Sequence, residues 1–240
     1  MADIYLIRHG QASFGKANYD ELSAQGQAQS YRLGVSMAEQ LGKSLQRRQV
    51  KVVHGTLLRH RQTLDEWLVG FNPTQLGMTL SVAEDSAFNE FDHEDMLEVA
   101  FPEYTDKGAL AAHLMQTENP RKAFHQLYER AVARWISGQH DDDYRESFAA
   151  FKQRCANGFR QLVANARSGE SIFVFTSGGP IGMSVQWALG LDDATTFKIN
   201  SALVNSSVTH FLTNTQGDCT LGYLNNYGHL FNEGVEVTYR

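Results

Sequence analysis

The sequence has few cysteines, no long hydrophobic run and no excess of positive charge. Its two cysteines, Cys155 and Cys219, are interpreted as free, partly buried thiols of a reducing compartment, with a disulfide as the less favoured alternative. No apolar segment is long enough to span a bilayer, and the opening MADIYLIRHG lacks the basic region of a signal peptide. We therefore expect a soluble, cytoplasmic protein.

The charge balance argues against polyanionic partners. A formal net charge of -6 gives no general attraction for nucleic acid or for an anionic membrane surface, so neither is an expected partner. The 240 residues are 42% hydrophobic and 20% charged, which is ordinary for a globular protein with a sizeable core. The sequence gives no indication of an oligomeric state.

Strand-like and helix-like segments alternate along the chain. Apolar runs at 3–7, 50–53 and 171–176 predict buried strands, and apolar residues at helical spacing predict helices between them. The end, from Asn205 to Asn226, predicts two strands joined by a turn. This order is typical of an α/β fold. We expect a three-layer α/β/α sandwich with a largely parallel central sheet and an antiparallel edge.

The chain has no repeat, low-complexity segment or linker, so a single domain over 1–240 is expected, with an inserted helical lobe at about 92–144. In open α/β sheets, ligands bind beyond the carboxyl ends of the strands. Two such ends carry reactive or glycine-rich turns. Arg8-His9-Gly10 follows the first strand, and Ser177-Gly178-Gly179 follows the third.

The Arg8-His9-Gly10 turn has the groups that phosphoryl chemistry needs. A neutral imidazole can attack phosphorus, and an adjacent guanidinium can hold the phosphoryl oxygens bidentately. A glycine after them lets the backbone turn and a ligand approach closely. The alternative is structural, with Arg8 paired to a surface acid and His9 covering the core.

Further motifs resemble those of the histidine phosphatase superfamily, in the branch that includes cofactor-dependent phosphoglycerate mutases and many small phosphatases. The resemblance spans almost the whole chain and implies a phosphoglycerate mutase-like fold. The matching residues beyond RHGQASFG are Leu22, Ser23, Gly26 and Gln29, then Arg59, Gln62 and Thr63, then Glu90 in FNEFDHE, then Asn205, Ser207, Val208, Thr209, Asn226, His229 and Leu230.

The resemblance implies a phosphatase that hydrolyses a small phosphate monoester without a cofactor or metal. His9 would attack the phosphoryl group and form a phosphohistidine. Arg8 and Arg59 would bind the phosphoryl oxygens, because phosphoryl transfer depends mainly on positioning and electrostatics. The expected partner is a small phosphorylated substrate or a phosphate ion. Gln11 and Ser13 are candidates for a further phosphate contact, with polar loop surface as the alternative.

The resemblance also implies an acid that protonates the leaving oxygen and then activates water, and Glu90 fits this role best. Asp92 and Glu94 are close enough in sequence to compete for it. No metal is implied, because His93-Glu94 is not followed by a second histidine at the zinc-protease spacing.

Ser177 stands where the family usually has a second histidine, in a Ser-His-Gly-Gly frame. Three interpretations are open. Ser177 and the backbone N–H groups of Gly178 and Gly179 suffice to bind phosphate at a helix N-terminus. Alternatively another histidine, with His93 as the first choice, enters the site and restores the charge. In the third interpretation the protein binds phosphate esters with little or no turnover. The resemblance extends to a subgroup that carries this serine.

Two other activities fit less of the sequence. A mutase-type phosphotransferase would have a Trp-Asn pair after the first motif, where this chain has Phe14-Gly15. A serine hydrolase would use Ser177 as nucleophile, but Phe175 stands where the Gly-x-Ser-x-Gly elbow needs its first glycine. This second alternative leaves the Arg8-His9 pair unexplained. Its other members would be Asp192 or Asp193 and His229.

Overall fold

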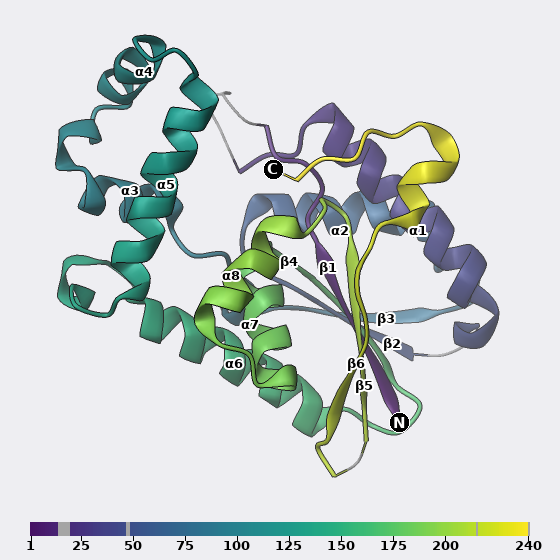
Figure 1. Ribbon diagram of the computed structural model, residues 1–240. Helices are drawn as coiled ribbons and strands as arrows, with labels where there is room; N and C mark the ends of the chain where they lie inside the picture. Colours follow the sequence, from purple (N-terminus) through teal and green to yellow (C-terminus); the bar gives the residue numbers. More distant parts are fainter. Residues whose placement is uncertain (14–19, 47–48, 215, 240) are drawn as a thin grey trace. The chain divides into compact units, whose positions relative to one another are not determined.

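The computed structural model describes residues 1–13, 20–46, 49–214 and 216–239. Phe14 and Gly15, which distinguish the chain from the mutase pattern, lie outside these ranges. The chain divides into two compact units (Figure 1). Unit 1 contains Met1–Glu90 and Cys155–Arg240, and unit 2 contains Phe91–Arg154. That residues at about 92–144 form a lobe inserted in one domain stays a prediction.

Unit 1 is built on a mixed six-stranded sheet with the spatial order β3-β2-β4-β1-β5-β6. The first four strands in this order are parallel neighbours, whereas β5 pairs antiparallel with β1 and β6 antiparallel with β5. The expected α/β fold with a largely parallel centre and an antiparallel edge is confirmed. The strands are β1 (Ala2–Arg8), β2 (Gln49–His54), β3 (Thr79–Glu84), β4 (Ser171–Thr176), β5 (Val208–Thr213) and β6 (Cys219–Asn226).

The apolar-run criterion misses β3. This strand pairs in parallel with β2 at the edge of the sheet, and all its side chains except that of Leu80 are exposed. An edge strand that buries so little has no continuous hydrophobic run for a sequence pattern to detect.

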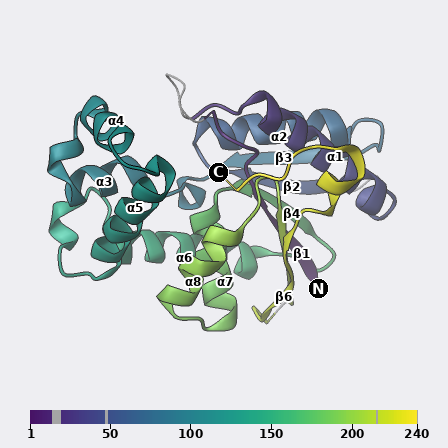
Figure 2. The ribbon, with the colours of Figure 1, turned by 45° about the horizontal axis from the view of Figure 1, so that its top comes forward.

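Helices cover both faces of the sheet (Figures 1 and 2). Tyr5 and Ile7 of β1 pack in one buried cluster with side chains of α1 and α2, while Ile4 and Leu6 pack in another with side chains of α6 and α7. Successive residues of a strand point to opposite faces, so one apolar run serves both layers. The helices of this unit are α1 (Ala24–Leu45), α2 (Leu58–Phe71), α6 (Phe148–Asn165, in part), α7 (Gly178–Leu189) and α8 (Asp193–Ala202), with short 3-10 helices η1 (Ser86–Phe88) and η4 (Gly228–Glu233).

Local sequence accounts for where the main helices begin and end. Ser23 is the N-cap of α1, and its hydroxyl accepts the Gly26 N–H at 3.0 Å. Asn72 ends α2 in the left-handed conformation, with φ 48°, directly before Pro73. Gly190 ends α7 in the same conformation.

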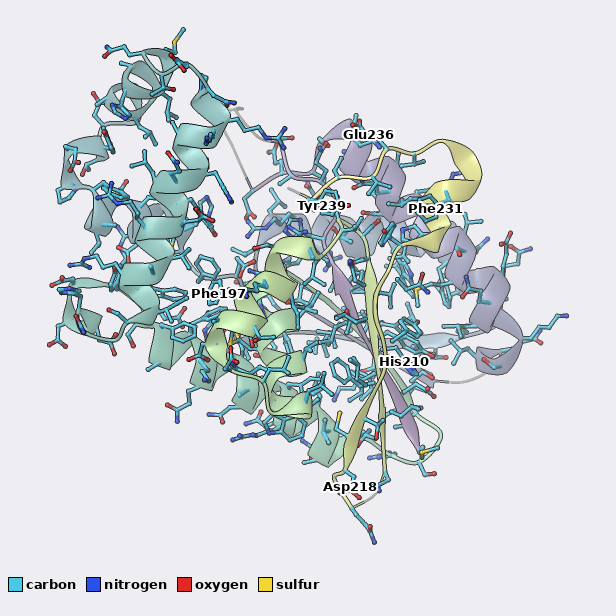
Figure 3. All side chains as sticks on the ribbon, in the orientation of Figure 1. Phe197, His210, Asp218, Phe231, Glu236 and Tyr239 are labelled. Carbon is cyan, nitrogen blue, oxygen red and sulfur yellow. The ribbon has the colours of Figure 1, made fainter. Side chains whose placement is uncertain are left out.

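The antiparallel side of the sheet is held by a polar and aromatic group around His210 of β5 (labelled in Figure 3). The His210 ring stacks on Tyr5 with centroids 4.7 Å apart, and its Nε2 lies 2.9 Å from Asp3 Oδ1. Cys155 is buried and Cys219 half-buried, and both are free thiols as expected. In the described ranges, no helix is long and apolar enough to cross a membrane.

Unit 2 is helical and has its own aromatic core. The Phe91 ring lies 4.9 Å from Trp135 and 5.5 Å from Phe151, and the Trp135 indole donates to the Glu146 carbonyl at 2.9 Å. These contacts give Trp135 a structural role. The elements are α3 (His93–Ala100), α4 (Lys107–Met115), α5 (Pro120–Ile136), the first part of α6, and the 3-10 helices η2 (Pro102–Tyr104) and η3 (Asp141–Asp143).

Candidate active site

The carboxyl ends of three adjacent parallel strands, β2, β4 and β1, bring the predicted residues of unit 1 together. Arg8 is the last residue of β1, and the N–H of His9 donates to the Thr176 carbonyl of β4 at 2.8 Å. Arg59 lies in the first turn of α2, directly after β2. Residues far apart in the sequence thereby meet at one edge of the sheet, where α/β proteins bind ligands.

His9 is buried and held as a neutral imidazole with a defined tautomer. Its Nδ1 lies 2.7 Å from the carbonyl oxygen of Gly10. A carbonyl can only accept, so Nδ1 carries the proton and Nε2 presents its lone pair. Burial lowers the pKa of His9 well below 6.5, and the charges of Arg59 and Arg8 lower it further. The neutral ring therefore presents an unprotonated Nε2.

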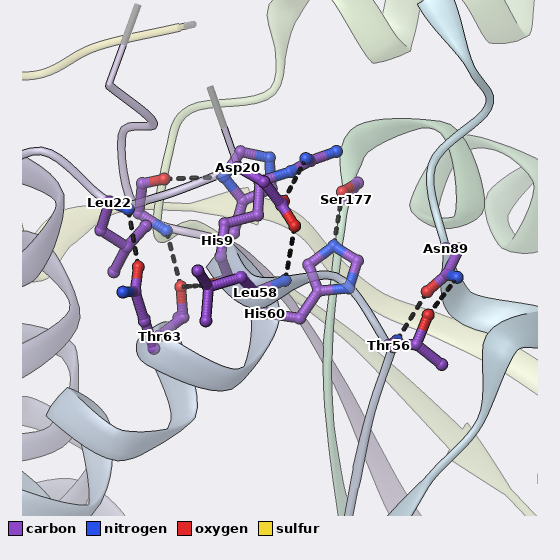
Figure 4. A network of polar contacts seen from close by, with 12 residues as sticks. His9, Asp20, Leu22, Thr56, Leu58, His60, Thr63, Asn89 and Ser177 are labelled. Atoms are coloured by element: carbon purple, nitrogen blue, oxygen red, sulfur yellow. Dashed lines mark hydrogen bonds and ion pairs between the residues drawn. The ribbon is translucent and has the colours of Figure 1, made fainter. Parts of the chain in front are cut away.

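The backbone around His9 is fixed by residues of the other motifs. The Gly10 N–H donates to Thr63 Oγ1 at 3.1 Å, and the His9 carbonyl accepts from Asn205 Nδ2 at 3.2 Å. Gln62 Oε1 accepts the Leu22 N–H at 2.7 Å (Figure 4). In this structure Gln62, Thr63 and Asn205 hold the turn by hydrogen bonds to its backbone and to that of the neighbouring loop.

Each of the two arginines has a fixed partner. Arg8 is buried, and its Nη1 donates to the Leu203 carbonyl. Arg59 Nη1 lies 2.7 Å from Asp20 Oδ1, and Asp20 Oδ2 accepts the N–H of Leu58, the first residue of α2, at 2.7 Å (Figure 4). Asp20 thus both orients Arg59 and caps the helix that carries it. Asp20 has no local sequence pattern that would identify it, because its partners are 38 and 39 residues away.

Of the three candidate acids, Glu90 lies at the N-terminus of α7, where its Oε2 accepts the Gly179 N–H at 3.1 Å. Asp92 instead caps α3, since its Oδ1 accepts the N–H groups of Glu94 and Asp95 at 3.1 and 3.0 Å. Glu94 is exposed in the first turn of that helix. This geometry favours Glu90 as the acid of the site.

Ser177 lies between β4 and α7, and its partner is a histidine that the sequence analysis misses. Ser177 Oγ is 2.6 Å from His60 Nε2, and both residues are fully buried (Figure 4). The rings of His60 and His9 have centroids 5.9 Å apart. Burial, Arg59 and His54 lower the pKa of His60 well below 6.5. The detectable signal is its position directly after Arg59 in RHRQT.

Two further expectations concern histidines. His93, the first choice to restore a charge, is the first residue of α3 in unit 2. His229, which the serine-hydrolase alternative assigns to Ser177, has its Nε2 2.9 Å from Ser206 Oγ. Because His60 occupies the position beside Ser177, the triad of the serine-hydrolase alternative is not assembled among the described residues.

The remaining predicted ligand residues adjoin this group. A Cβ on Gly178 would lie against the Asn200 amide, so glycine lets the helix start this close to the Asn200 side chain. Gln11 Oε1 accepts from the Ser23 hydroxyl at 2.8 Å, which ties Gln11 to the N-cap of α1. In the part of the chain that the structure describes, no group of three His, Cys, Asp or Glu could hold a metal ion.

A family profile shows which superfamily the chain belongs to. The profile of the histidine phosphatase superfamily (branch 1) matches residues 4–226. The chain belongs to this superfamily. Its histidine phosphatase fold is also that of solved structures, although identities of 20% or less make this likeness one of fold alone. No curated protein sequence matches the chain.

Three of these solved structures show which kinds of protein share the fold. A phosphoserine phosphatase mutant from Entamoeba histolytica in complex with phosphoserine has 17% identity and a TM-score of 0.59 over 96% of this chain and 100% of its own. A mycobacterial glucosyl-3-phosphoglycerate phosphatase in complex with VO3 has 20% identity and a TM-score of 0.53 over 93% and 98%. YhfR of Bacillus stearothermophilus has 16% identity and a TM-score of 0.59 over 96% and 100%.

Proposed function

We propose that the protein is a metal-independent phosphatase that hydrolyses a small phosphate monoester through a phosphohistidine on His9. The observation that carries the proposal is the state of His9. Its Nδ1–H is bound to the Gly10 carbonyl, its Nε2 lone pair is available, and burial, together with the charges of Arg59 and Arg8, holds its pKa low. A neutral histidine beside two guanidiniums is suited to attack a phosphoryl group whose charge those guanidiniums neutralise.

In the first step, His9 Nε2 forms a bond to phosphorus as the bond to the ester oxygen breaks. Glu90 donates a proton to the leaving oxygen, and the alcohol departs. In the second step, Glu90 takes a proton from water, the water oxygen bonds to phosphorus, and the phosphorus–nitrogen bond breaks. Inorganic phosphate leaves, and both His9 and Glu90 return to their starting protonation states.

The phosphoryl oxygens are held by Arg8 and Arg59, with Ser177, Gly178 and Gln11 as further donors. The position of Ser177 and Gly178 at the N-terminus of α7 supports this assignment, because helix N-termini favour anions. The phosphoserine and VO3 in the two related structures are small oxyanionic ligands, which supports a small phosphorylated substrate.

The first test is hydrolysis of p-nitrophenyl phosphate in the presence of a chelator, for the wild type beside His9→Ala. Turnover in the wild type and its loss in His9→Ala are expected, together with an acid-labile, base-stable phosphate on the wild type alone. His125→Ala, an exposed histidine of α5, is the matched control and keeps full activity. Equal activity in His9→Ala would refute the mechanism.

A catalytically weak or inactive phosphoester-binding protein is the second candidate, favoured by the neutral Ser177 at a position that faces the phosphate. It predicts binding of inorganic phosphate by calorimetry without turnover of any phosphate ester. Loss of that binding in His9→Ala would then identify the same site.

A further inference from the structure

Ser177 occupies the N-cap position of α7, yet its side chain makes no capping hydrogen bond. Serine normally caps a helix by accepting an N–H of the first turn. Here the hydroxyl lies 2.6 Å from His60 Nε2 on α2, and both residues are completely buried. Because Oγ can donate one proton and accept others, the position of the shared proton decides what the hydroxyl offers to a ligand.

The surroundings of His60 Nδ1 decide where that proton is. Nδ1 is buried and makes no hydrogen bond, and a Cβ added at Gly55 would lie against this Nδ1 and 2.8 Å from His60 Cε1. A buried N–H without an acceptor is rarer and more costly than an unused lone pair. Nδ1 therefore carries the lone pair, and Nε2–H donates to Ser177 Oγ.

This tautomer leaves one proton on the Ser177 hydroxyl for a ligand. Among the described residues, His60 is the hydrogen-bond partner of that hydroxyl, so the O–H proton has no acceptor among them. The centroids of the His9 and His60 rings are 5.9 Å apart, and a Cβ added at Gly178, the next residue along the chain, would lie 3.8 Å from Arg8 Nε. The unused O–H is thus at the place where a phosphoryl group on His9 would present its oxygens.

We infer that His60 is a positioning residue for the proposed phosphatase: its Nε2–H fixes the Ser177 hydroxyl so that the hydroxyl donates to a phosphoryl oxygen. The inference rests on the proposed function of the same site. No proton is transferred, and no bond forms at either residue. The imidazole acts through Ser177: it orients the hydroxyl, which then adds a hydrogen-bond donor to the site without adding a charge.

The test compares His60→Ala, Ser177→Ala and the double variant in hydrolysis of p-nitrophenyl phosphate. Each single change should lower kcat/KM by about 100-fold to 1,000-fold, which is typical for the loss of one donor to a developing oxyanion. The double variant should lose no more than either single variant, because the two groups act in series. The decrease should fall mainly on kcat.

Orthovanadate gives a readout that a merely structural role would not change. Vanadate resembles the transition state of phosphoryl transfer, so its inhibition constant should rise by the same factor in His60→Ala and in Ser177→Ala. This factor should be larger than the factor by which the inhibition constant of inorganic phosphate rises. His60→Gln, which keeps an amide N–H, should recover part of the loss. Ser184→Ala is the matched control, because this buried serine of α7 donates to the Pro180 carbonyl, away from His60, and should leave both constants unchanged.

Independent, multiplicative losses in the double variant would overturn the inference, as would an unchanged ratio of vanadate to phosphate inhibition. Covalent labelling of Ser177 by a fluorophosphonate that requires His60 would also overturn it, because His60 would then be removing the serine proton. Failure of the proposed function is separate, since it shows as activity that His9→Ala retains. If no ester is turned over, calorimetric binding of vanadate and phosphate to the same variants gives the same comparison.

Discussion

Replacing Gly26 by alanine should inactivate the site without unfolding the protein. Gly26 lies in the first turn of α1, and the turn that follows His9 packs directly on it. An added Cβ would lie against the Gln11 carbonyl oxygen and 2.7 Å from the Gln11 nitrogen, and both atoms belong to the backbone. Because backbone atoms cannot rotate away as a side chain can, the turn carrying His9 must move by roughly 1 Å to restore normal contact.

The magnitude follows from two opposed effects. Overpacking of this kind costs about 1–3 kcal/mol, and alanine in a helix recovers up to about 1 kcal/mol relative to glycine. The free energy of unfolding should therefore fall by about 0–3 kcal/mol. A displacement of about 1 Å in a catalytic group lowers the rate by roughly 100-fold, so activity should be affected far more than stability.

Gly42→Ala is the matched control in the last turn of the same helix. Gly42 is also buried, but an added Cβ would meet the end of the Leu76 side chain at 3.3 Å, which can adjust. This variant should equal the wild type in activity and match or slightly exceed it in stability. Urea unfolding and kcat/KM for p-nitrophenyl phosphate measure both quantities. Equal activity of Gly26→Ala and Gly42→Ala would refute the reasoning.

Three further predictions concern buried polar groups. Ser177→His alone should lower turnover, because the added ring would compete for the space of His60, whose Nε2 is only 2.6 Å from the present hydroxyl. Steady-state kinetics of this variant measure the effect. An increase in turnover would contradict the prediction. Burial lowers the pKa of His229 from 6.5 to about 4, so between these pH values the unfolded chain binds more protons than the folded one. The free energy of unfolding should therefore fall as the pH drops from about 6.5 to about 4. In urea titrations at several pH values, His229→Gln should reduce the slope of the free energy of unfolding against pH by up to about 1.4 kcal/mol per pH unit. Burial raises the pKa of the Cys219 thiol to about 11. A thiol reagent at pH 8 should therefore label Cys219 slowly in the folded protein and rapidly in urea. Equal labelling rates would show that the thiol is exposed in the folded protein.

Much of the architecture was predictable, because it depends on local patterns. The apolar runs at β1, β2 and β4 form strands as predicted. The segments with apolar residues at helical spacing form helices, some with caps that the sequence shows, such as Ser23. The adjacency of Arg8 and His9 at a strand end also predicted the edge of the sheet at which the candidate residues meet. The exposed edge strand β3 was not predictable in this way, because it buries too little to leave a pattern.

The choice among candidate residues required contacts between distant parts of the chain. Glu90 and Asp92 are neighbours in an acidic segment, but Glu90 accepts a hydrogen bond from the start of α7 whereas Asp92 caps α3. Sequence spacing could not separate them, since two residues in an irregular segment can point in any direction until their partners are placed.

The class of fold, the candidate nucleophile and the candidate anion-binding turn follow from the sequence, because each depends on residues that are adjacent or periodic in the chain. The partner of the Ser177 side chain depends instead on the tertiary structure. Its partner His60 is 117 residues away, on a different helix, and the two meet because β2 and β4 are neighbours in the sheet. Strand order is set by the packing of the whole core, so no local pattern in the chain could have revealed that pair.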